Sequence, residues 1–277
     1  MKYCITNTRK KFKYIDNVDE ITIRFRRQDT TLLDFFQLHK TQRINVYIDD
    51  IDDFIESENI ELMNAFAEKY PEINFALKFK DQGIDKNKEI AKMIHENKVK
   101  HKFFFDTFIR DWDTLFGYIE LQPSDVYIVE NLGFEIVSVA EILHTANIRV
   151  RVFPNIAQSA WKETPALKKF FIRPEDVFFY EPYVDVMEFM GREESIATYY
   201  KIYAIDKKWF GKLNEVILDF DDSEIDSRFI IPSFAERRLN CGKRCYKGRP
   251  CQICNAIEGL AAVLESENLM VTSIEDN

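Results

Sequence analysis

Short apolar segments rich in β-branched and aromatic residues alternate along this chain with segments whose apolar residues recur at helical spacing. Tight hairpin signals do not separate the strand-like segments; a helical pattern stands between one and the next. Strands that are joined through helices run parallel, because the helix carries the chain back to the same edge of the sheet. The pattern therefore predicts an α/β fold built from βαβ units.

The number of strand-like segments narrows the choice of α/β architecture. Eight occur before residue 190, at 21–25, 43–48, 73–79, 102–106, 125–129, 148–153, 170–173 and 184–189. Eight successive βα units predict a closed (β/α)8 barrel of the TIM type over residues 1–190. Residues 191–277 remain outside that count and are too apolar for a disordered tail. We expect them to form a C-terminal extension that packs on the barrel and carries a metal site.

Polar residues follow the predicted strands at matching positions, where barrel enzymes place their chemistry. Carboxylates beside strongly apolar strands are costly to leave unpaired, so each needs a partner or a ligand. The candidates at the strand ends are Glu130, Asn131, Asn155, Gln158, Arg173, Glu175 and Glu188. A structural interpretation stays open for all of them, since Asn131 could cap a helix and Arg173 could pair with Glu188 or Glu130.

Four segments resemble the later strands of the collagenase-like peptidase family. They read DVYIVENLG from Asp125, IRVRVFPNIAQS from Ile148, FFIRPEDV from Phe170 and VDVMEFMG from Val184. The family's fifth strand resembles D-x-x-I-V-x-D-L-G, its sixth leads to a polar loop with glutamine, its seventh carries an Arg-Glu pair, and its eighth ends in E-x-F-x-H-G. Its members include oxygen-independent hydroxylases of ubiquinone synthesis and of RNA modification.

The resemblance implies a barrel enzyme with an iron–sulfur cluster held by four cysteines. It implies catalytic roles for Glu188, Arg173 and Glu130, with substrate bound by Asn131, Asn155, Gln158 and Glu175. The chain departs from the family at two places. Met190 stands where the family has histidine, and the cysteines lie some 50 residues after Gly191 instead of directly behind it.

Four of the five cysteines lie in one basic stretch, NCGKRCYKGRPCQIC. Cys241, Cys245, Cys251 and Cys254 have the close spacing that lets four thiolates converge on one centre. A tetrahedral Zn²⁺ and a [4Fe–4S] cluster both accept four thiolates. Zinc ribbons usually separate their two pairs by more than the five residues found here, which favours the cluster. The neighbouring lysines and arginines would offset the negative charge of the thiolates.

Two functions remain open on the sequence. One is an iron–sulfur enzyme, a hydroxylase or other modifying enzyme that acts on RNA or a small molecule. The other is a binding or assembly protein, with a protein partner, whose four-cysteine site holds a structural zinc. The net charge of −9 argues against a surface that grips nucleic acid throughout. No apolar run reaches the roughly 20 residues of a bilayer span, and no secretory signal opens the chain, so we expect a cytoplasmic protein that does not enter the membrane.

Overall fold

The structure is a computed structural model in which the described residues are 1–6, 14–24, 39, 41–55, 57–96, 99, 101–158, 169–221, 225–231, 234–239, 259 and 263. Its centre is one sheet of nine parallel strands in the order β5-β4-β3-β2-β1-β9-β8-β7-β6. The strands are β1 (Lys2–Thr6), β2 (Glu20–Arg24), β3 (Arg43–Ile48), β4 (Phe75–Phe79), β5 (Lys102–Phe105), β6 (Phe108–Ile109), β7 (Asp125–Ile128), β8 (Arg149–Val152) and β9 (Val186–Phe189). The predicted α/β fold with a parallel sheet is confirmed.

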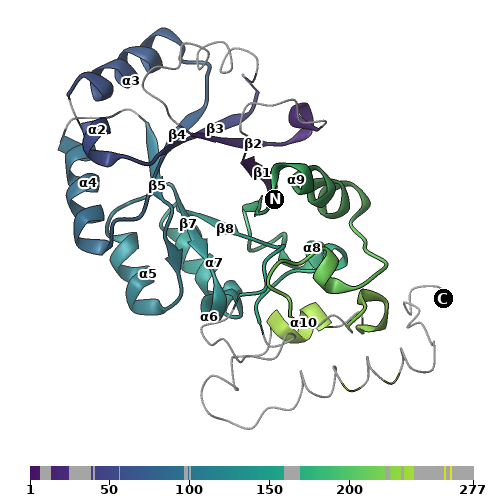
Figure 1. The fold of residues 1–277 in the computed structure, drawn as a ribbon. Helices are drawn as coiled ribbons and strands as arrows, with labels where there is room; N and C mark the ends of the chain where they lie inside the picture. The colour runs from purple at the N-terminus through teal and green to yellow at the C-terminus, as the bar shows by residue number, and fades with distance from the viewer. Residues whose placement is uncertain are drawn as a thin grey trace.

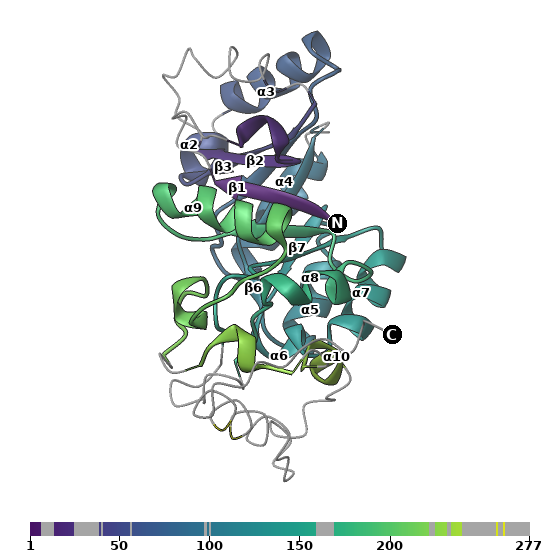
Figure 2. The same ribbon diagram turned by 90° about the vertical axis from the view of Figure 1, so that its right-hand side faces the viewer.

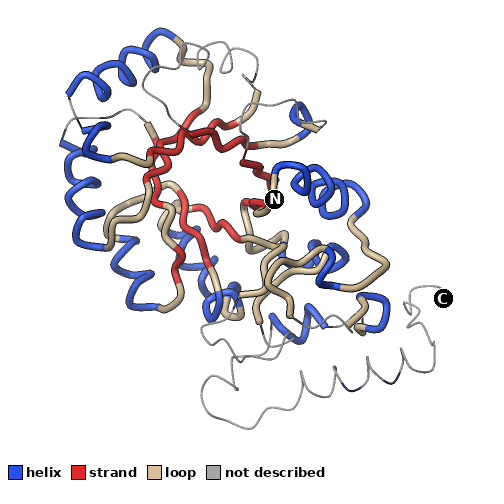
Figure 3. Tube along the Cα trace, in the orientation of Figure 1, coloured by secondary structure: helices blue, strands red, loops and turns tan. Residues whose placement is uncertain are grey.

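The sheet is strongly curled, and Figure 3 shows its strands surrounding a central space. Strands β5 and β6 stand at opposite ends of the strand order, yet only Asp106 and Thr107 separate them in the chain. The two ends of the sheet must therefore come close together. Register is continuous across the middle of the sheet, where Val46 lies beside Leu77, and across the N-terminal strand, where Cys4 lies beside Glu188.

Helices cover the outer face of the sheet (Figure 1). They are α2 (Ile51–Ile55), α3 (Ser57–Lys69), α4 (Ile84–Glu96), α5 (Trp112–Ile119), α6 (Glu130–Gly133), α7 (Ile136–Thr145), α8 (Val177–Tyr180), α9 (Glu193–Tyr200) and α10 (Phe234–Leu239). Short 3-10 turns are η1 (Ile15–Asn17), η3 (Pro174–Asp176), η5 (Leu213–Glu215) and η6 (Ser227–Phe229), and the π-helical segment η4 (Lys201–Asp206) continues α9. None of the described helices is long and apolar enough to cross a membrane.

The hydrophobic core lies between the sheet and these helices. Alternate strand residues, such as Ile21, Ile23 and Val46, are buried there. Residues after 190 belong to the same core, since Ile196 and Phe234 are buried in it. Figure 2 shows α9 beside β1, where it packs against the N-terminal strand. The domain boundary expected at residue 190 stays a prediction.

One strand prediction was wrong. Residues 170–173 form no strand of the sheet; Phe170 makes only an isolated bridge with Gln158, and Pro174 begins a 3-10 turn directly afterwards. Instead β8 pairs directly with β9, and β1, which the sequence interpretation missed, lies between β9 and β2. The apolar segment 214–220 likewise forms no strand of the sheet, because η5 begins at Leu213 and only Leu218 makes a bridge, with Ile156.

Candidate functional site

Charged side chains fill much of the space that the sheet encloses. Arg43 on β3 contacts Asp125 on β7, and these strands are not neighbours, so the contact crosses the enclosed space. We call the whole group the interior charge cluster; it consists of Glu20, Arg43, Lys78, Asp106, Asp125, Arg149, Arg151 and Glu188. Four acids stand against four bases, so the group is electrically balanced.

Arg151 is the centre of this cluster and is fully buried. Its guanidinium donates to Glu20, to Asp125 Oδ1 at 3.1 Å and to Glu188 Oε2 at 3.2 Å. Arg43 Nη2 lies 2.5 Å from the other oxygen of Asp125. Burial alone would raise the pKa of Glu20 and of Asp125, but the arginines outweigh burial and hold each pKa below its ordinary value. These carboxylates are ionised and paired.

Glu188 lies nearer the carboxyl ends of the strands and is held by four donors. Tyr127 Oη donates at 2.6 Å and Arg151 at 3.2 Å to Oε2, while Lys78 Nζ and Thr6 Oγ1 each lie 3.4 Å from Oε1. Burial would raise the pKa of Glu188, yet Lys78 and Arg151 hold it below the ordinary value. Glu188 is therefore a fixed anion.

Lys78 links Glu188 to the mouth of the enclosed space. Its ammonium also pairs with Asp106 at 3.1 Å and lies 4.8 Å from the ring centroid of Tyr127 and 5.6 Å from that of Tyr47. Burial, Asp106 and Asp49 raise the pKa of Tyr47 to about 12, so its phenol keeps its proton. The ammonium is enclosed by two carboxylates and two aromatic faces.

Aromatic rings form a platform beside these charges. Tyr127 and Phe153 stack with ring centroids 4.9 Å apart and planes within 2°. Phe108 meets Phe153 edge-to-face at 5.4 Å and is 40% exposed, although it is a large apolar residue. A pocket of about 460 Å³ opens near the ends of β2, β3 and β4, lined by Arg24, Asp49, Asp50, Ile51, Asp52, Lys80, Gln82 and Lys86. The carboxyl ends of the strands thus offer an exposed aromatic ring and a polar cavity.

Glu130 stands apart from the interior charge cluster, at the carboxyl end of β7. Its φ is +48°, a left-handed conformation that a glutamate adopts only under constraint. The residue is 7% exposed, and its Oε2 has no hydrogen-bond partner among the described residues. Burial raises the pKa of Glu130, although Arg110, 3.3 Å away, lowers it in part. Burial beside a single arginine therefore disfavours the ionised form of this carboxyl.

Two predicted binding residues lie beside Glu130. Gln158 Oε1 accepts from the backbone N–H of Glu130 at 3.3 Å, and the buried Oδ1 of Asn131 has no partner among the described residues. Asn131 is not the N-cap of α6, which begins at Glu130 after Val129. The structure therefore brings Glu130, Asn131 and Gln158 together.

The other predicted residues have structural surroundings. Arg173 does not pair with Glu188 or Glu130; it makes a two-pronged contact with Asp176 at 2.6 and 2.7 Å and lies 3.3 Å from Glu175. Glu175 also accepts from Ser227. Arg173, Glu175 and Asp176 thus pair with one another, and Glu175 also contacts Ser227. They lie in a buried loop at the place where the seventh strand was expected.

Asn155 fixes the end of β9. Its side-chain amide accepts from the N–H of Met190 at 3.1 Å and donates to the C=O of Met190 at 2.7 Å. The four metal-site cysteines, Cys241, Cys245, Cys251 and Cys254, lie outside the described residues. Among the described residues, no group of three or more histidine, cysteine, aspartate or glutamate side chains could hold a metal ion.

Sequence reasoning missed much of the interior charge cluster. Glu20, Arg43, Lys78 and Arg151 all stand inside strands, at positions that alternate with apolar residues. The alternation of charged and apolar residues in EITIR and RVRV could have indicated these positions. Alternate residues of a strand lie on opposite faces of the sheet, and in a curled sheet one face borders the enclosed space.

Comparisons with known proteins add little to this geometry. No protein-family model matches the chain, and no curated protein matches it. Among solved structures, an endo-1,4-β-xylanase from Caldicellulosiruptor owensensis is similar over 69% of this chain and 84% of its own, with 12% sequence identity and a TM-score of 0.39. Similarity at this level carries no argument about chemistry.

Proposed function

We propose that the protein is a closed (β/α)8 barrel enzyme that transfers protons at the carboxyl ends of its strands. Closure is supported by β5 and β6, which act as two halves of one broken strand: the first pairs with β4 and the second with β7. A hydrogen bond of 2.7 Å from the N–H of Ser124 to the C=O of Phe103 joins the two sides. Counting β5 and β6 as one strand leaves eight.

The proposal is carried by two carboxyl groups whose surroundings move their pKa values in opposite directions. Glu188 is kept ionised by Lys78 and Arg151, whereas burial raises the pKa of Glu130. Opposed pKa values in one site are typical of an acid–base pair with divided roles. Glu130 would exchange the proton, and the Glu188–Lys78 pair would stabilise charge. Tyr127, bonded to Glu188, precedes Glu130 by three residues, so the Cα atoms of Tyr127 and Glu130 are at most about 10 Å apart.

The substrate that fits this surface has a planar ring. The exposed Phe108 and the stacked Phe153 offer an aromatic face next to the ionised groups. Rings stack on such faces whether they belong to a nucleobase in RNA or to a small molecule. Asn131 Oδ1 and Gln158 would position polar groups of the same substrate.

We propose that Cys241, Cys245, Cys251 and Cys254 hold a [4Fe–4S] cluster. Four thiols from one short segment with adjacent lysines and arginines suit this group. The described chain reaches Leu239, two residues before Cys241, in helix α10. Buried Arg238 anchors α10 by donating to the C=O of Phe171 at 3.2 Å and lies 4.9 Å from the ring of Phe134.

That anchor holds α10, the last described helix before the cysteine segment, beside Phe134. Phe134 follows α6, whose first residue is Glu130. When bound, an iron–sulfur cluster supplies single-electron chemistry, in keeping with the oxygen-independent hydroxylation that the family resemblance implies. Around it, Glu130 would hold or release a proton, and Phe108 would shield the ring from water.

A zinc-stabilised binding or assembly protein is the second candidate. The balance of charges favours it, because every ionised member of the interior charge cluster already has a partner of opposite sign. Such a cluster needs no substrate to explain it.

Metal analysis and an absorption spectrum of protein purified without oxygen separate the two. About four iron atoms per chain, with broad visible absorption that the Cys251→Ser variant loses, is the expected result. About one zinc per chain and no colour would refute the iron–sulfur proposal.

Carboxyl ¹³C titration tests the acid–base assignment: Glu130 is expected to titrate above about 4.3, the ordinary glutamate value, and Glu188 below it. Ordinary values for both would refute the division of roles.

A further inference from the structure

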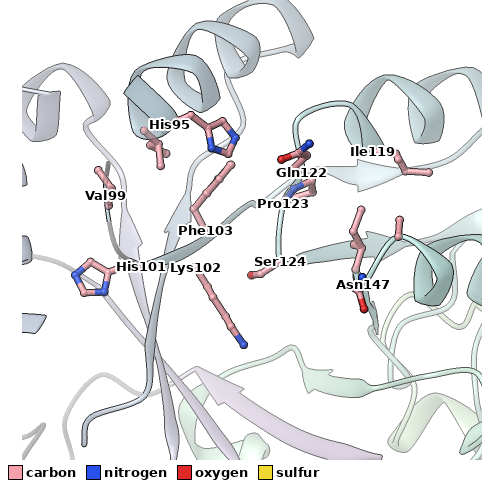
Figure 4. A pocket seen from close by; sticks show the side chains of 13 residues that line it. His95, Val99, His101, Lys102, Phe103, Ile119, Gln122, Pro123, Ser124 and Asn147 are labelled. Carbon is pink, nitrogen blue, oxygen red and sulfur yellow. The ribbon is translucent and has the colours of Figure 1, made fainter. Parts of the chain in front are cut away.

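A second pocket lies at the opposite end of the sheet from the proposed active site. It has a volume of about 510 Å³ and sits at the amino ends of β5 and β7 (Figure 4). The C-terminal ends of α4, α5 and α7 border it through His95, Ile119 and Asn147. No role in the proposed reaction falls to this end.

The pocket exists because the sheet is split there. β5 pairs with β4, and pairing to β7 begins only at β6, where Phe108 lies beside Tyr127. The amino halves of β5 and β7 are joined through the N–H of Ser124 and the C=O of Phe103. The gap leaves room that the surrounding helix ends enclose.

The side chains around this pocket favour a negative ligand. Its lining contains Lys102, His95 and His101 and no carboxylate. Lys102 is exposed and lines the pocket, and it makes no ion pair with any residue that the structure describes. The sequence from His95 to Lys102 holds three lysines against Glu96 alone, and Glu96 is engaged by Lys92 at 3.7 Å.

Uncharged donors complete the lining. The side-chain amides of Gln122 and Asn147 face the pocket from the ends of α5 and α7 (Figure 4). Ser124 is not free to donate, because its hydroxyl already donates to Asp125 Oδ2 at 2.5 Å. Its backbone amide is used as well, so the available donors are the lysine and the two amides.

The helix ends do not themselves require a cation. Exposed carbonyls at helix C-termini attract positive charge. Here the last carbonyls are satisfied by the backbone: Gln122 N–H donates to Ile119 at 3.0 Å, and Ile148 N–H donates to Leu143 at 2.9 Å. Gln122 and Asn147 adopt left-handed φ angles of 53° and 58°, as in helix-capping turns. The positive charge of Lys102 is thus left for a ligand.

We propose that this pocket binds a small molecule through an oxyanion, a carboxylate or a phosphate, with Lys102 as the charged contact. The amides of Gln122 and Asn147 donate to its oxygens. Phe103 and Ile119 give the pocket an apolar wall for the rest of the molecule. The site is independent of the proposed reaction and of the metal.

The test follows backbone amide NMR shifts on titration with inorganic phosphate and with succinate, at constant ionic strength set by chloride. Saturable shifts confined to residues 122, 124 and 146–148 are expected for one of the two anions. Lys102→Met should weaken binding about tenfold or more, as loss of a charge-assisted contact does. Ala146→Glu, which places a carboxylate in the lining, should abolish it.

Lys88→Met is the matched control, because Lys88 is an exposed lysine of α4 outside the pocket. It should bind as the unaltered chain does. Absence of localised shifts with both anions would overturn the proposal. So would equal binding by the Lys102 and Lys88 variants, since the charge would then act only through the general field of the surface.

Discussion

Replacing Arg151 with methionine tests the view that the interior of the sheet is held by paired charges. The arginine is fully buried and contacts Glu20, Asp125 and Glu188. Methionine fills a similar volume but leaves three buried carboxylates without their central cation. Breaking a buried pair in this way costs about 3–5 kcal/mol of the free energy of unfolding. For a chain of this size that corresponds to a fall in Tm of roughly 6–20 °C.

The free energy of unfolding should also depend on pH differently in the two proteins. Folding lowers the pKa of Glu20, Asp125 and Glu188, so their stabilisation is present above about pH 4 and is lost as the pH falls through the lowered values. Without Arg151 these pKa values rise, because Arg43, Arg149 and Lys78 alone then oppose burial, and the folded variant takes up protons at a higher pH than the unaltered protein as the pH falls from 7 to 5. The stability gap between the two proteins should therefore narrow over this range.

The assay is urea unfolding at pH 7 and pH 5, followed by circular dichroism. Arg24→Met is the control, because Arg24 pairs with Asp49 at 2.8 Å on the exposed surface and should cost about 0–1 kcal/mol. A loss below about 1 kcal/mol for the Arg151 variant, or the same loss at both pH values, would refute the reasoning.

Three further changes probe the frame around the site. Gly133→Ala should destabilise by about 1–3 kcal/mol in urea unfolding, because the added Cβ would lie 2.5 Å from the ring of Phe170; an unchanged midpoint would show that the ring moves freely. Asn155→Ala should cost about 1–3 kcal/mol through its two lost bonds to Met190, and faster amide exchange at residue 190 would locate the effect. Arg173→Met should lower the free energy of unfolding by about 3–5 kcal/mol without changing the metal content, because it breaks the buried pair with Asp176. A fully stable variant that no longer binds its ligand would instead support the catalytic role expected for Arg173.

Much of the fold could be predicted from local pattern. The predicted strand at 43–48 coincides with β3, and the helical pattern expected between the strands at 125–129 and 148–153 is observed as α7. Both segments have a clear period of apolar residues, which burial against one face imposes. The segment FFIR at 170–173 has the same composition as a strand but sits in the connection between β8 and β9, and composition does not distinguish the two.

The candidate site was only partly visible in the sequence. Glu188 and Glu130 stand out because each carboxylate adjoins an apolar strand. Lys78 did not stand out, since a lysine in FALKF reads as a residue that reaches water. Its place between Glu188 and Asp106 depends on β4 facing β9 across the enclosed space, with Lys78 3.4 Å and 3.1 Å from the two carboxylates.

The sequence by itself determined the alternation of strands and helices and the gathering of four thiols in one segment, because periodicity and ligand spacing are local properties of the chain. Only the tertiary structure decided which charges meet. Arg151 meets Glu20 across 131 residues of sequence, and the pKa values of Glu188 and Glu130 diverge because one is surrounded by cations while the other is buried beside a single arginine. Pairing and burial are properties of the folded chain, so no residue's charge state can be assigned until its neighbours in space are known.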